Sequence, residues 1–437
     1  WPLEKIISNS DDFFKFFQSK WESTVNARKI ISIPFNDLCI YNHLVYLFLV
    51  GKLTPVNTPP DDHPEWMKVG IQDFDEKTQL MKLEEHLKTI YLELGKLDES
   101  SQYVEWQNLS LNWASLYSKC YFQNSLQLSE NITDEINKKF ACWVDQKYKL
   151  LHNTISDFPI MVHSIFDYLN KEKQDKIALI VMDGMSLSQW QIIKEILNKL
   201  KPQIKDESHA IFAWIPTVTS ISRQCIFSGS KPYELQDSLF TTTEDEKHWQ
   251  KRWIDDGNLR KDQIFYKTNV KVWDENQFKN IPFDSKDVLG LVINTIDDKM
   301  HSAKGGMKDL LGQIKDWSEN SKFFDFLEKL LKNNFQVFLT SDHGNIEAIG
   351  IGEPRSVDAG ERGRRMRHYE NEESMNNAHQ NINSEIWWPK MAGPKYHFLL
   401  SKKNEAFSKP VGESVVTHGA KSFQEVMVPF VKLWWEE

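Results

Sequence analysis

The stretch that decides the fold reads Ile177-Ala178-Leu179-Ile180-Val181-Met182-Asp183-Gly184-Met185-Ser186. Six apolar residues in a row are typical of a strand that is buried on both faces. The carboxylate of Asp183 follows at once, and Gly184 then permits a sharp turn into a helix. An Asp in this position either caps the next helix or binds a ligand beyond the edge of a sheet. The stretch therefore predicts a buried strand with a polar group at its carboxyl end.

Three more apolar runs in the second half of the chain lead into polar residues in the same way. The runs and the residues that follow them are 210–215 with Thr219, 288–296 with Asp297 and His301, and 335–340 with Asp342 and His343. Amphipathic segments separate the runs, and this alternation is typical of βαβ units. We therefore predict an α/β fold with a mostly parallel sheet flanked by helices. Its polar residues should gather at one edge, because ligands bind beyond the carboxyl ends of such strands.

Weaker signals extend this pattern. Short apolar runs predict strands near residues 264–266 and 397–400, and residues 424–433 predict a final helix that leads into an edge strand. One long helix over residues 307–333 should cover a face of the sheet. The stretches near 230–262 and 345–394 are too long for simple connections, so we interpret them as insertions with a functional or flexible role.

The first part of the chain has a different texture. Apolar residues recur at helical spacing, for example in residues 76–94, and a proline-rich break at 54–64 separates helical parts. Its Trp and Tyr residues are expected to pack in cores and interfaces. A chain of 437 residues is too long for one typical domain. We predict a helical N-terminal domain over residues 1–165 and an α/β domain over residues 166–437.

Composition excludes several classes of protein. A hydrophobic content of 40% with 26% charged residues describes a globular protein, and a net charge of −9 argues against a generic DNA coat protein. The four scattered cysteines form no CxxC pair and are expected to be reduced. No apolar stretch approaches the ~18 residues of a membrane span and no signal peptide is visible, so we expect a cytoplasmic protein with no membrane partner. The chain begins with Trp1 rather than Met, so we expect further residues upstream.

Three carboxylates, three imidazoles and one hydroxyl are candidates for a single site. They are Asp183, Asp297, Asp342, His301, His343, His418 and Thr219. Such a set can hold two divalent metal ions, and the mixture of imidazole and carboxylate suits Zn²⁺ or Mn²⁺ better than Mg²⁺. A metal would favour the alkoxide of Thr219 for attack on phosphorus. Each residue taken alone also has a structural interpretation, because Asp and Thr commonly cap helices.

Four motifs in order carry a family resemblance. They are Asp183-Gly184, Pro216-Thr217-Val218-Thr219, Asp297-Asp298-Lys299-Met300-His301 and Ser341-Asp342-His343-Gly344-Asn345. This ordered set resembles the metal-binding and nucleophile motifs of the alkaline phosphatase superfamily. The segment after His418, with Ser422 and Glu425 at capping-box spacing, is similar to the closing segment of the PglZ domain of bacterial BREX phage-defence systems. The resemblance covers a little over half of the chain and implies an alkaline-phosphatase-like core.

The resemblance also implies a role for each site residue. One metal would be held by Asp183, Thr219, Asp342 and His343, and the other by Asp297, His301 and His418; the family usually binds two Zn²⁺. Thr219 is preferred to Thr217 as the nucleophile, because the fourth residue of that turn has this role in the phosphodiesterase branch. Met300 stands where the superfamily has Gly, and Asp298 is an alternative ligand to Asp297. The implied activity is that of a metal-dependent phosphodiesterase or nuclease-like hydrolase that acts in phage defence beside other BREX proteins.

Basic residues gather after the Asp-His-Gly motif. Arg364, Arg365 and Arg367 lie there, and Arg223 follows the nucleophile turn. Arg suits phosphate recognition because its guanidinium makes paired hydrogen bonds. We interpret these four as candidates to bind a phosphoester, nucleotide or oligonucleotide substrate. The alternatives are a solvated charged loop and, for Arg223, an ion pair on a helix surface.

Two other functions are open on the sequence alone. The helical N-terminal part, which the resemblance leaves unexplained, favours an interaction or scaffold subunit of a defence complex in which metal stabilises the fold and turnover is little or none. A phosphatase or mutase that acts on small monoesters is the third candidate. The sequence does not indicate an oligomeric state.

Overall fold

The computed structural model describes residues 10–49, 52–56, 58, 63–71, 76–173, 176–354, 365–387 and 395–436. The chain divides into two compact units. The first comprises Trp1–Lys96 and Asn112–Asp134, and the second comprises Leu97–Leu111 and Glu135–Glu437. This division runs through the helices α5 (Tyr103–Phe122) and α6 (Gln127–Trp143), whereas the sequence pattern placed a boundary near residue 165.

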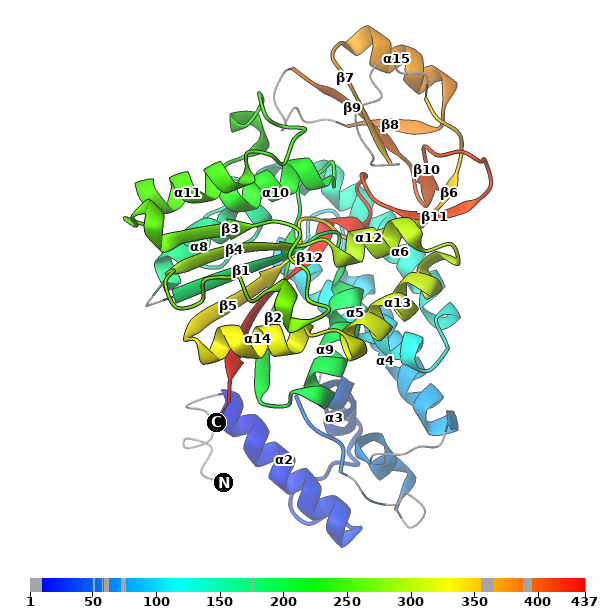
Figure 1. The fold of residues 1–437 in the computed structure, drawn as a ribbon. Helices are drawn as coiled ribbons and strands as arrows, with labels where there is room; N and C mark the ends of the chain where they lie inside the picture. Colours follow the sequence, from blue (N-terminus) through cyan, green and yellow to red (C-terminus); the bar gives the residue numbers. More distant parts are fainter. Residues whose placement is uncertain are drawn as a thin grey trace. The chain divides into compact units, whose positions relative to one another are not determined.

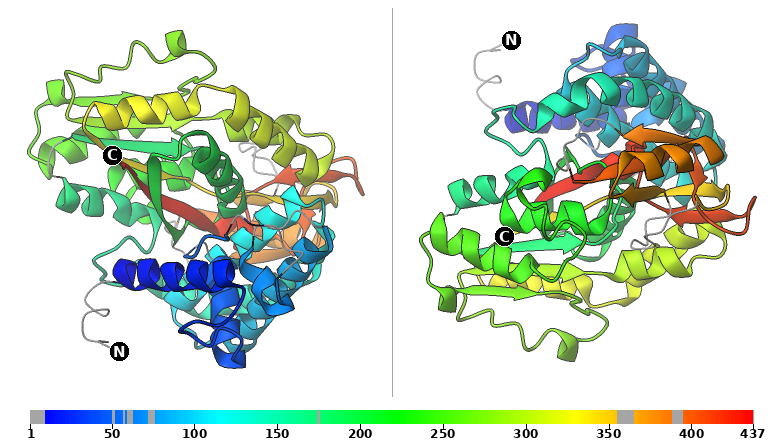
Figure 2. Two further views of the ribbon diagram at one scale, coloured as in Figure 1. Left: turned by 90° about the horizontal axis from the view of Figure 1, so that it is seen from below. Right: turned by 90° about the horizontal axis from the view of Figure 1, so that it is seen from above.

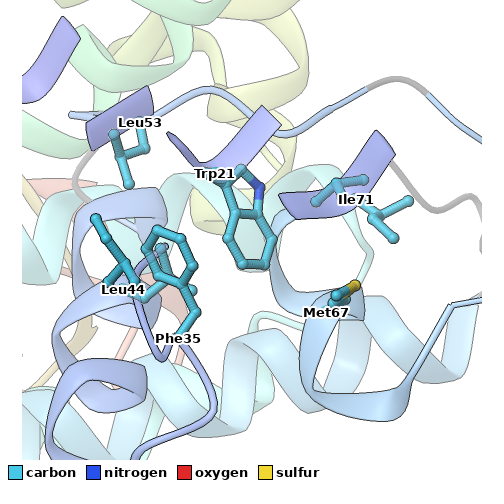
Figure 3. Close-up of a cluster of buried hydrophobic side chains, with 8 residues drawn as sticks. Trp21, Phe35, Leu44, Leu53, Met67 and Ile71 are labelled. Carbon is cyan, nitrogen blue, oxygen red and sulfur yellow. The ribbon is translucent and has the colours of Figure 1, made fainter. Parts of the chain in front are cut away.

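The first unit is built from helices, as expected for this part of the chain. Its elements are α2 (Ser10–Ala27), α3 (Leu38–Leu49), the 3₁₀ helix η2 (Glu65–Gly70), α4 (Glu76–Lys96) and its share of α5 and α6. Trp21 is fully buried in its core, in a cluster that includes Phe35, Leu44 and Met67 (Figure 3). The indole Nε1 donates to the carbonyl oxygen of Gly70 over 3.1 Å, which ties η2 to α2.

A six-stranded sheet forms the centre of the second unit. Its strands, in order across the sheet, are β2 (Ile204–Phe212), β12 (Met427–Trp435), β5 (Phe335–Thr340), β1 (Lys176–Met182), β4 (Val288–Ile293) and β3 (Ile264–Lys267). The strands β5, β1, β4 and β3 run parallel, while β12 is antiparallel to both of its neighbours. Every residue of β4 and all but the first of β1 are buried, which explains their unbroken apolar runs. The predicted α/β fold with a mostly parallel sheet is confirmed.

Helices cover both faces of this sheet. On one face lie α8 (Ile165–Glu172), α10 (Thr219–Ser228) and α11 (Asp245–Asp255), and on the other lie α9 (Leu187–Leu200), α13 (Gly306–Asn320) and α14 (Phe323–Lys332) (Figure 1). The first layer packs closely, since a Cβ on Gly290 of β4 would lie 2.9 Å from Nε1 of Trp249 in α11. On the opposite face, the indole of Trp190 in α9 donates to the Ser208 hydroxyl of β2 over 2.9 Å. The central strands of the sheet are therefore shielded from water on both sides.

The two stretches interpreted as insertions contain regular structure. Residues 230–262 hold the 3₁₀ helices η5 (Pro232–Glu234) and η6 (Lys261–Gln263) as well as α11. The strands β6 to β11, which follow the Asp-His-Gly motif, form two three-stranded sheets, in the orders β10-β6-β11 and β7-β9-β8. Their elements are β6 (Ile346–Gly350), β7 (Met366–Tyr369), α15 (Glu372–Asn381), β8 (Ser384–Trp387), β9 (His397–Ser401), β10 (Glu405–Ala406) and β11 (Ser414–Thr417). Met375 and Ala378 pack α15 against the second of these sheets (Figure 1).

Short elements complete the second unit. They are the π-helix η3 (Val144–Tyr148), α7 (Lys149–Leu151), the 3₁₀ helices η4 (Val162–Ser164) and η7 (Glu275–Gln277), α12 (Thr295–Ser302) and α16 (Phe423–Val426).

Among the described helices, none combines the length and hydropathy that a bilayer crossing requires. All four cysteines are free thiols, with Cys120 and Cys225 buried.

Three expectations differ from the structure in detail. The helix predicted over 307–333 is two helices, α13 and α14, because the chain turns at Ser321 and Lys322; Figure 2 shows the two following one another along one side of the sheet. The strand β12 lies inside the sheet rather than at its edge, since it pairs with both β2 and β5. The strand expected at 210–215 is β2, and it begins earlier, at Ile204. Its first half is polar and partly exposed, so this half gave no apolar signal in the sequence.

Candidate metal centre

Three strands deliver polar residues to one edge of the sheet. Because β1 runs parallel between β5 and β4, the residues that follow these strands meet at the carboxyl edge. Asp183 follows β1, Asn294 follows β4, and Asp342 and His343 come shortly after β5. One ligand atom from each of Asp183, Asp342 and His343 lies within 4.8 Å of the others, and all three residues are buried. This spacing suits a shared cation.

Asp183 divides its two carboxylate oxygens between different partners. Its Oδ2 accepts hydrogen bonds from Nη1 of Arg223 and from Nδ2 of Asn294, each over 2.9 Å. Its Oδ1 lies 3.4 Å from the Thr219 hydroxyl. Burial raises the pKa of this carboxyl well above its usual value, and the charge of Asp342 raises it further. An ionised Asp183 therefore needs more positive charge than Arg223 alone provides.

Asp342 supplies the direct test of whether a cation fits. Its Oδ1 accepts from the backbone amides of Gly184 and His343, each over 3.0 Å. Its Oδ2 is fully buried and has no hydrogen-bond partner among the described residues. Burial raises the pKa of Asp342 to about 6. A buried carboxylate oxygen without a donor is costly, and a divalent ion bound by carboxylates and imidazole satisfies it. The donor set therefore fits a metal.

The hydrogen bond on the far side of the His343 ring fixes its tautomer. Nδ1 lies 2.9 Å from the carbonyl oxygen of Gly344, which can only accept, so Nδ1 carries the proton. The lone pair of Nε2 in the neutral ring then faces the site, 3.0 Å from the hydroxyl oxygen of Thr219. Thr219 is the first residue of α10, so its hydroxyl lies at the positive end of a helix. The neutral ring is the form that binds metals.

His418 comes from the small sheet beside the site. The antiparallel register of β6 and β11 pairs Ile346 with Thr417, which places His418 next to the residues that follow β5. The imidazoles of His343 and His418 stack with their centroids 3.8 Å apart and their planes at 17°. His418 Nδ1 donates to the carbonyl oxygen of Thr217 over 2.8 Å, so its Nε2 also presents a lone pair. Burial and the neighbouring His343 together lower the pKa of His418 to about 3.

Asp297 and His301 form the remaining pair. They lie one turn apart on α12, with His301 Nε2 at 3.4 Å from Asp297 Oδ1. A Cβ on Gly184 would lie 3.7 Å from the Asp297 Cβ, so this residue borders the group around Asp183. Burial acts to raise the pKa of Asp297, but the hydrogen bond from His301 and the charge of His418 lower it overall. Asp298 points away, is exposed and pairs with Lys271 at 3.2 Å. The structure thus places all seven predicted residues at one edge of the sheet.

A buried network behind the site involves Thr217 and Glu425. The Thr217 hydroxyl donates to the carbonyl oxygen of Ala420 over 2.8 Å and accepts from the amide of Gly419 over 3.1 Å. Glu425 Oε1 accepts from the Ala420 amide over 2.9 Å, and Ser422 and Glu425 form the expected capping box. These bonds hold the turn that carries His418. The Thr217 side chain is thus used for support, in contrast to that of Thr219.

The four Arg candidates are differently placed. Arg223 is buried, with Nε and Nη1 bound to carboxylates, so the helix-surface alternative does not describe it. Arg365 is also buried, and its three nitrogens donate to Glu425 and to the carbonyl oxygens of Glu405 and Lys403. Those donors are turned into the protein. The Arg367 guanidinium donates to the carbonyl oxygens of Met366 and Phe407. Arg364 lies outside the described residues.

Three residues of this region escaped the sequence analysis. Asn294 follows β4 directly, so its position carried the same signal as Asp183, but β4 was expected to run on to residue 296. Asp245, in α11, accepts a hydrogen bond from Arg223. It lies in the polar stretch 230–262, whose apolar residues show no strong helical or strand spacing. Glu425 was noted only as a capping residue, although its carboxylate also receives Arg365.

The mixed sheet with this edge defines an alkaline phosphatase-like domain, and residues 160–433 match the family described as the BREX system PglZ alkaline phosphatase-like domain. More than half of the chain is matched, so the chain belongs to the PglZ family. Comparison with curated proteins gives no match. Among solved structures, murine ectonucleotide pyrophosphatase/phosphodiesterase 5 is similar with a TM-score of 0.41 at 12% identity, over 59% of this chain and 88% of that one. The human counterpart has a TM-score of 0.39 at 12% identity, over 59% and 87%.

Proposed function

We propose that this protein is a metal-dependent phosphoester hydrolase, a phosphodiesterase or nuclease-like enzyme in which Thr219 is the nucleophile. The observation that carries the proposal is the place of the Thr219 hydroxyl. It lies at the N-terminus of α10, within 3.0 Å of a His343 lone pair and 3.4 Å of Asp183. A Thr used only to cap the helix would instead direct its oxygen to the backbone amides of α10.

Two divalent cations, Zn²⁺ or Mn²⁺, are the proposed cofactors. Asp183, Thr219, Asp342 and His343 would hold one, and Asp297, His301 and His418 would hold the other. Bound cations would supply Lewis-acid stabilisation of the Thr219 alkoxide and of the phosphoryl oxygens. The buried Asp342 oxygen without a donor supports the first of these sites. His343 and His418 each present an Nε2 lone pair, and these two lone pairs support two adjacent cation sites.

The chain's own groups then carry the reaction. Thr219 Oγ1 attacks the phosphorus of the diester, and the P–O bond to one alcohol breaks. That alcohol leaves with the proton of the Thr219 hydroxyl, and the remaining phosphoryl group, with its second alcohol, becomes esterified to Thr219. Water hydrolyses this ester and restores the hydroxyl. The positive end of α10 favours the anionic phosphoryl group next to Thr219. Without a cation, His343 Nε2 accepts a hydrogen bond from the Thr219 hydroxyl over 3.0 Å, and with a cation bound this lone pair would serve as its ligand.

The surroundings of Arg223 favour a diester over a monoester. A monoester dianion needs more positive charge near its phosphorus than a diester monoanion does. Arg223 is the basic residue nearest in sequence to Thr219, and its Nε and Nη1 already bind Asp245 and Asp183. This supports a nucleotide or oligonucleotide substrate over the small monoesters of a phosphatase or mutase. The PglZ family also supports a role in phage defence beside other BREX proteins.

An interaction subunit is the second candidate, and the surface of the first unit favours it. Leu38 and Leu92 are 73% and 70% exposed there, and Met81 is 47% exposed. Large apolar side chains mark a docking surface where they form one contiguous patch, so this alternative expects the three to belong to such a patch. In this alternative the metal stabilises the fold, and turnover is little or none.

The test combines metal content with hydrolysis of bis(p-nitrophenyl) phosphate and of p-nitrophenyl phosphate. The proposal expects about two metals per chain and faster turnover of the diester. Metal without turnover of either ester would favour the interaction subunit. Faster turnover of the monoester would favour a phosphatase. Absence of bound metal in a zinc- and manganese-supplemented preparation would contradict the site.

A further inference from the structure

We propose that Asp245 is a positioning residue of the candidate metal centre, acting through Arg223 on Asp183. The inference rests on the proposed function, because it concerns the same site. Asp245 lies in the polar stretch 230–262 and belongs to none of the motifs that carry the family resemblance.

Aromatic packing holds Asp245 in place. Asp245, Trp249 and Trp253 are the buried residues of α11, and their spacing of four puts them on one face of the helix. The Trp249 ring meets Phe227 of α10 edge to face, with centroids 5.5 Å apart. Tyr266 of β3 packs on the same phenyl ring at 5.1 Å and directs its hydroxyl to Asp245 Oδ2 over 3.3 Å. The carboxylate is therefore fixed between α10 and β3.

Arg223 connects this carboxylate to the site. Its Nε donates to Asp245 Oδ2 over 2.8 Å and its Nη1 to Asp183 Oδ2 over 2.9 Å. The side chains are 6% exposed for Arg223, 0% for Asp245 and 3% for Asp183. Arg223 follows Thr219 by one helical turn, so both side chains project from the same face of α10. A rigid guanidinium held at Nε by Asp245 can present Nη1 in only one direction.

The consequence falls on the two oxygens of Asp183. Arg223 and Asn294 both donate to Oδ2, which leaves Oδ1 as the oxygen that faces Thr219. Asp245 thus determines which oxygen Asp183 offers to a cation, although it touches neither the cation site nor Thr219. Without Asp245, the buried Arg223 would have one carboxylate where it now has two and could turn to bind both oxygens of Asp183. Carboxylate ligands of metals are commonly oriented by such outer partners, whose loss lowers metal affinity by roughly 10- to 100-fold.

The experiment is a double-mutant cycle on zinc affinity, measured by competition with a chromogenic chelator. Asp245→Asn and Arg223→Gln are each expected to weaken zinc binding by roughly 10- to 100-fold. The double variant should bind zinc no more weakly than Arg223→Gln alone, because Asp245 acts through Arg223. With bis(p-nitrophenyl) phosphate, Asp245→Asn should lower kcat at saturating zinc and change KM by less than about twofold, since Asp245 is not proposed to contact substrate.

Asp206→Asn is the matched control. Asp206 is also a buried carboxylate, 2.8 Å from the Lys194 ammonium group, but it lies in β2 away from Thr219 and Asp183. It should leave zinc affinity within about twofold of the parent even where the protein is less stable. If Asp245→Asn does not fold, Arg223→Lys replaces it. Lys keeps the charge but cannot hold two carboxylates in one fixed geometry, so the same loss of affinity is expected.

Zinc affinity of Asp245→Asn within twofold of the parent would overturn the inference, as would parental affinity in Arg223→Lys. Losses that multiply in the double variant would also overturn it, because Asp245 would then act independently of Arg223. In either case a parent that binds zinc and hydrolyses the diester leaves the proposed function intact. A parent that binds no metal would overturn both.

Discussion

The hydroxyl oxygen of Thr219 lies 3.0 Å from Nε2 of His343, although the two residues are 124 positions apart in the chain. The start of α10 brings Thr219 to this point and the end of β5 brings His343. The ring cannot use its other nitrogen here, because Nδ1 is bound to Gly344. Thr219 and a group able to bind metal are therefore held in contact by the fold itself.

Replacement of Asp342 by Asn should have opposite effects on stability and on metal binding. Asn keeps the shape and removes a buried charge whose pKa is raised to about 6. At pH 8 the metal-free variant should be more stable than the metal-free parent by about 3 kcal/mol, because the parent must ionise this group in a dry site. Zinc affinity should fall, since a carboxylate ligand is lost.

Urea unfolding of both proteins with and without zinc measures these two opposite effects, on the stability of the metal-free protein and on its stabilisation by zinc. Zinc should stabilise the parent much more than the variant. An Asn variant that is less stable than the parent without zinc and equally stabilised by it would remove Asp342 from the site.

Gly344→Ala should disrupt the centre by displacing the turn behind it. A Cβ at residue 344 would lie 1.9 Å from the carbonyl oxygen of Gln424, which is backbone and cannot rotate away. The Gly344 amide also donates to the backbone carbonyl oxygen of Glu425 over 2.9 Å, so the clash reaches α16 and the turn that carries His418. We expect a loss of about 2 kcal/mol or more in unfolding free energy, together with reduced zinc content.

Gly95→Ala is the control for this prediction. Gly95 lies in α4, and a Cβ there would meet no atom within 4 Å. Ala should stabilise the helix by roughly 0.5–1 kcal/mol and leave zinc content unchanged. Equal stability and zinc content in both Ala variants would show that the close approach at Gly344 is not required.

His86 predicts a pH dependence that is independent of the metal centre. Burial lowers its pKa to about 3, and the charge of Lys119 adds to the effect. An unfolded His takes up a proton near pH 6.5, so below that pH the unfolded state binds more protons than the folded state. Stability should therefore fall as the pH falls from 6.5 toward 3, by about 2 kcal/mol between pH 6.5 and 5 from this residue.

Urea unfolding of the parent and His86→Gln across this range isolates the contribution, because other titrating groups are common to both proteins. Gln cannot take up the proton, so the variant should lose about 2 kcal/mol less than the parent between pH 6.5 and 5. Parallel pH profiles would show that His86 is not buried in its neutral form.

Residues whose signal is local could be predicted from the sequence. Asp183 and Asp342 come after short strands in which all but one residue is buried, so an apolar run and the polar residue after it predicted both their burial and their common edge. The stack of His343 on His418 has no such signal, because it depends on the pairing of β6 with β11 across a long, polar stretch. That contact became visible only in three dimensions.

Asp245 marks the limit of periodicity as a signal. The spacing Asp245, Trp249, Trp253 is helical, but the positions between are polar and the buried face includes a charge. An apolar-periodicity test does not detect such a face. Arg365 illustrates the reverse case. Its residue type suggested phosphate binding, but its guanidinium donates hydrogen bonds to Glu425 and to two carbonyl oxygens. Residue type alone does not reveal a partner that is distant in sequence.

The most direct test of the account is the rate of bis(p-nitrophenyl) phosphate hydrolysis by Thr219→Ala, with zinc content measured on the same samples. The variant should retain the zinc content of the parent, because carboxylates and imidazoles supply the other ligands, while turnover falls on the order of 10³-fold or more. Thr219→Ser, which keeps a hydroxyl, should retain measurable turnover. A Thr219→Ala variant that hydrolyses the diester as fast as the parent would contradict the central claim.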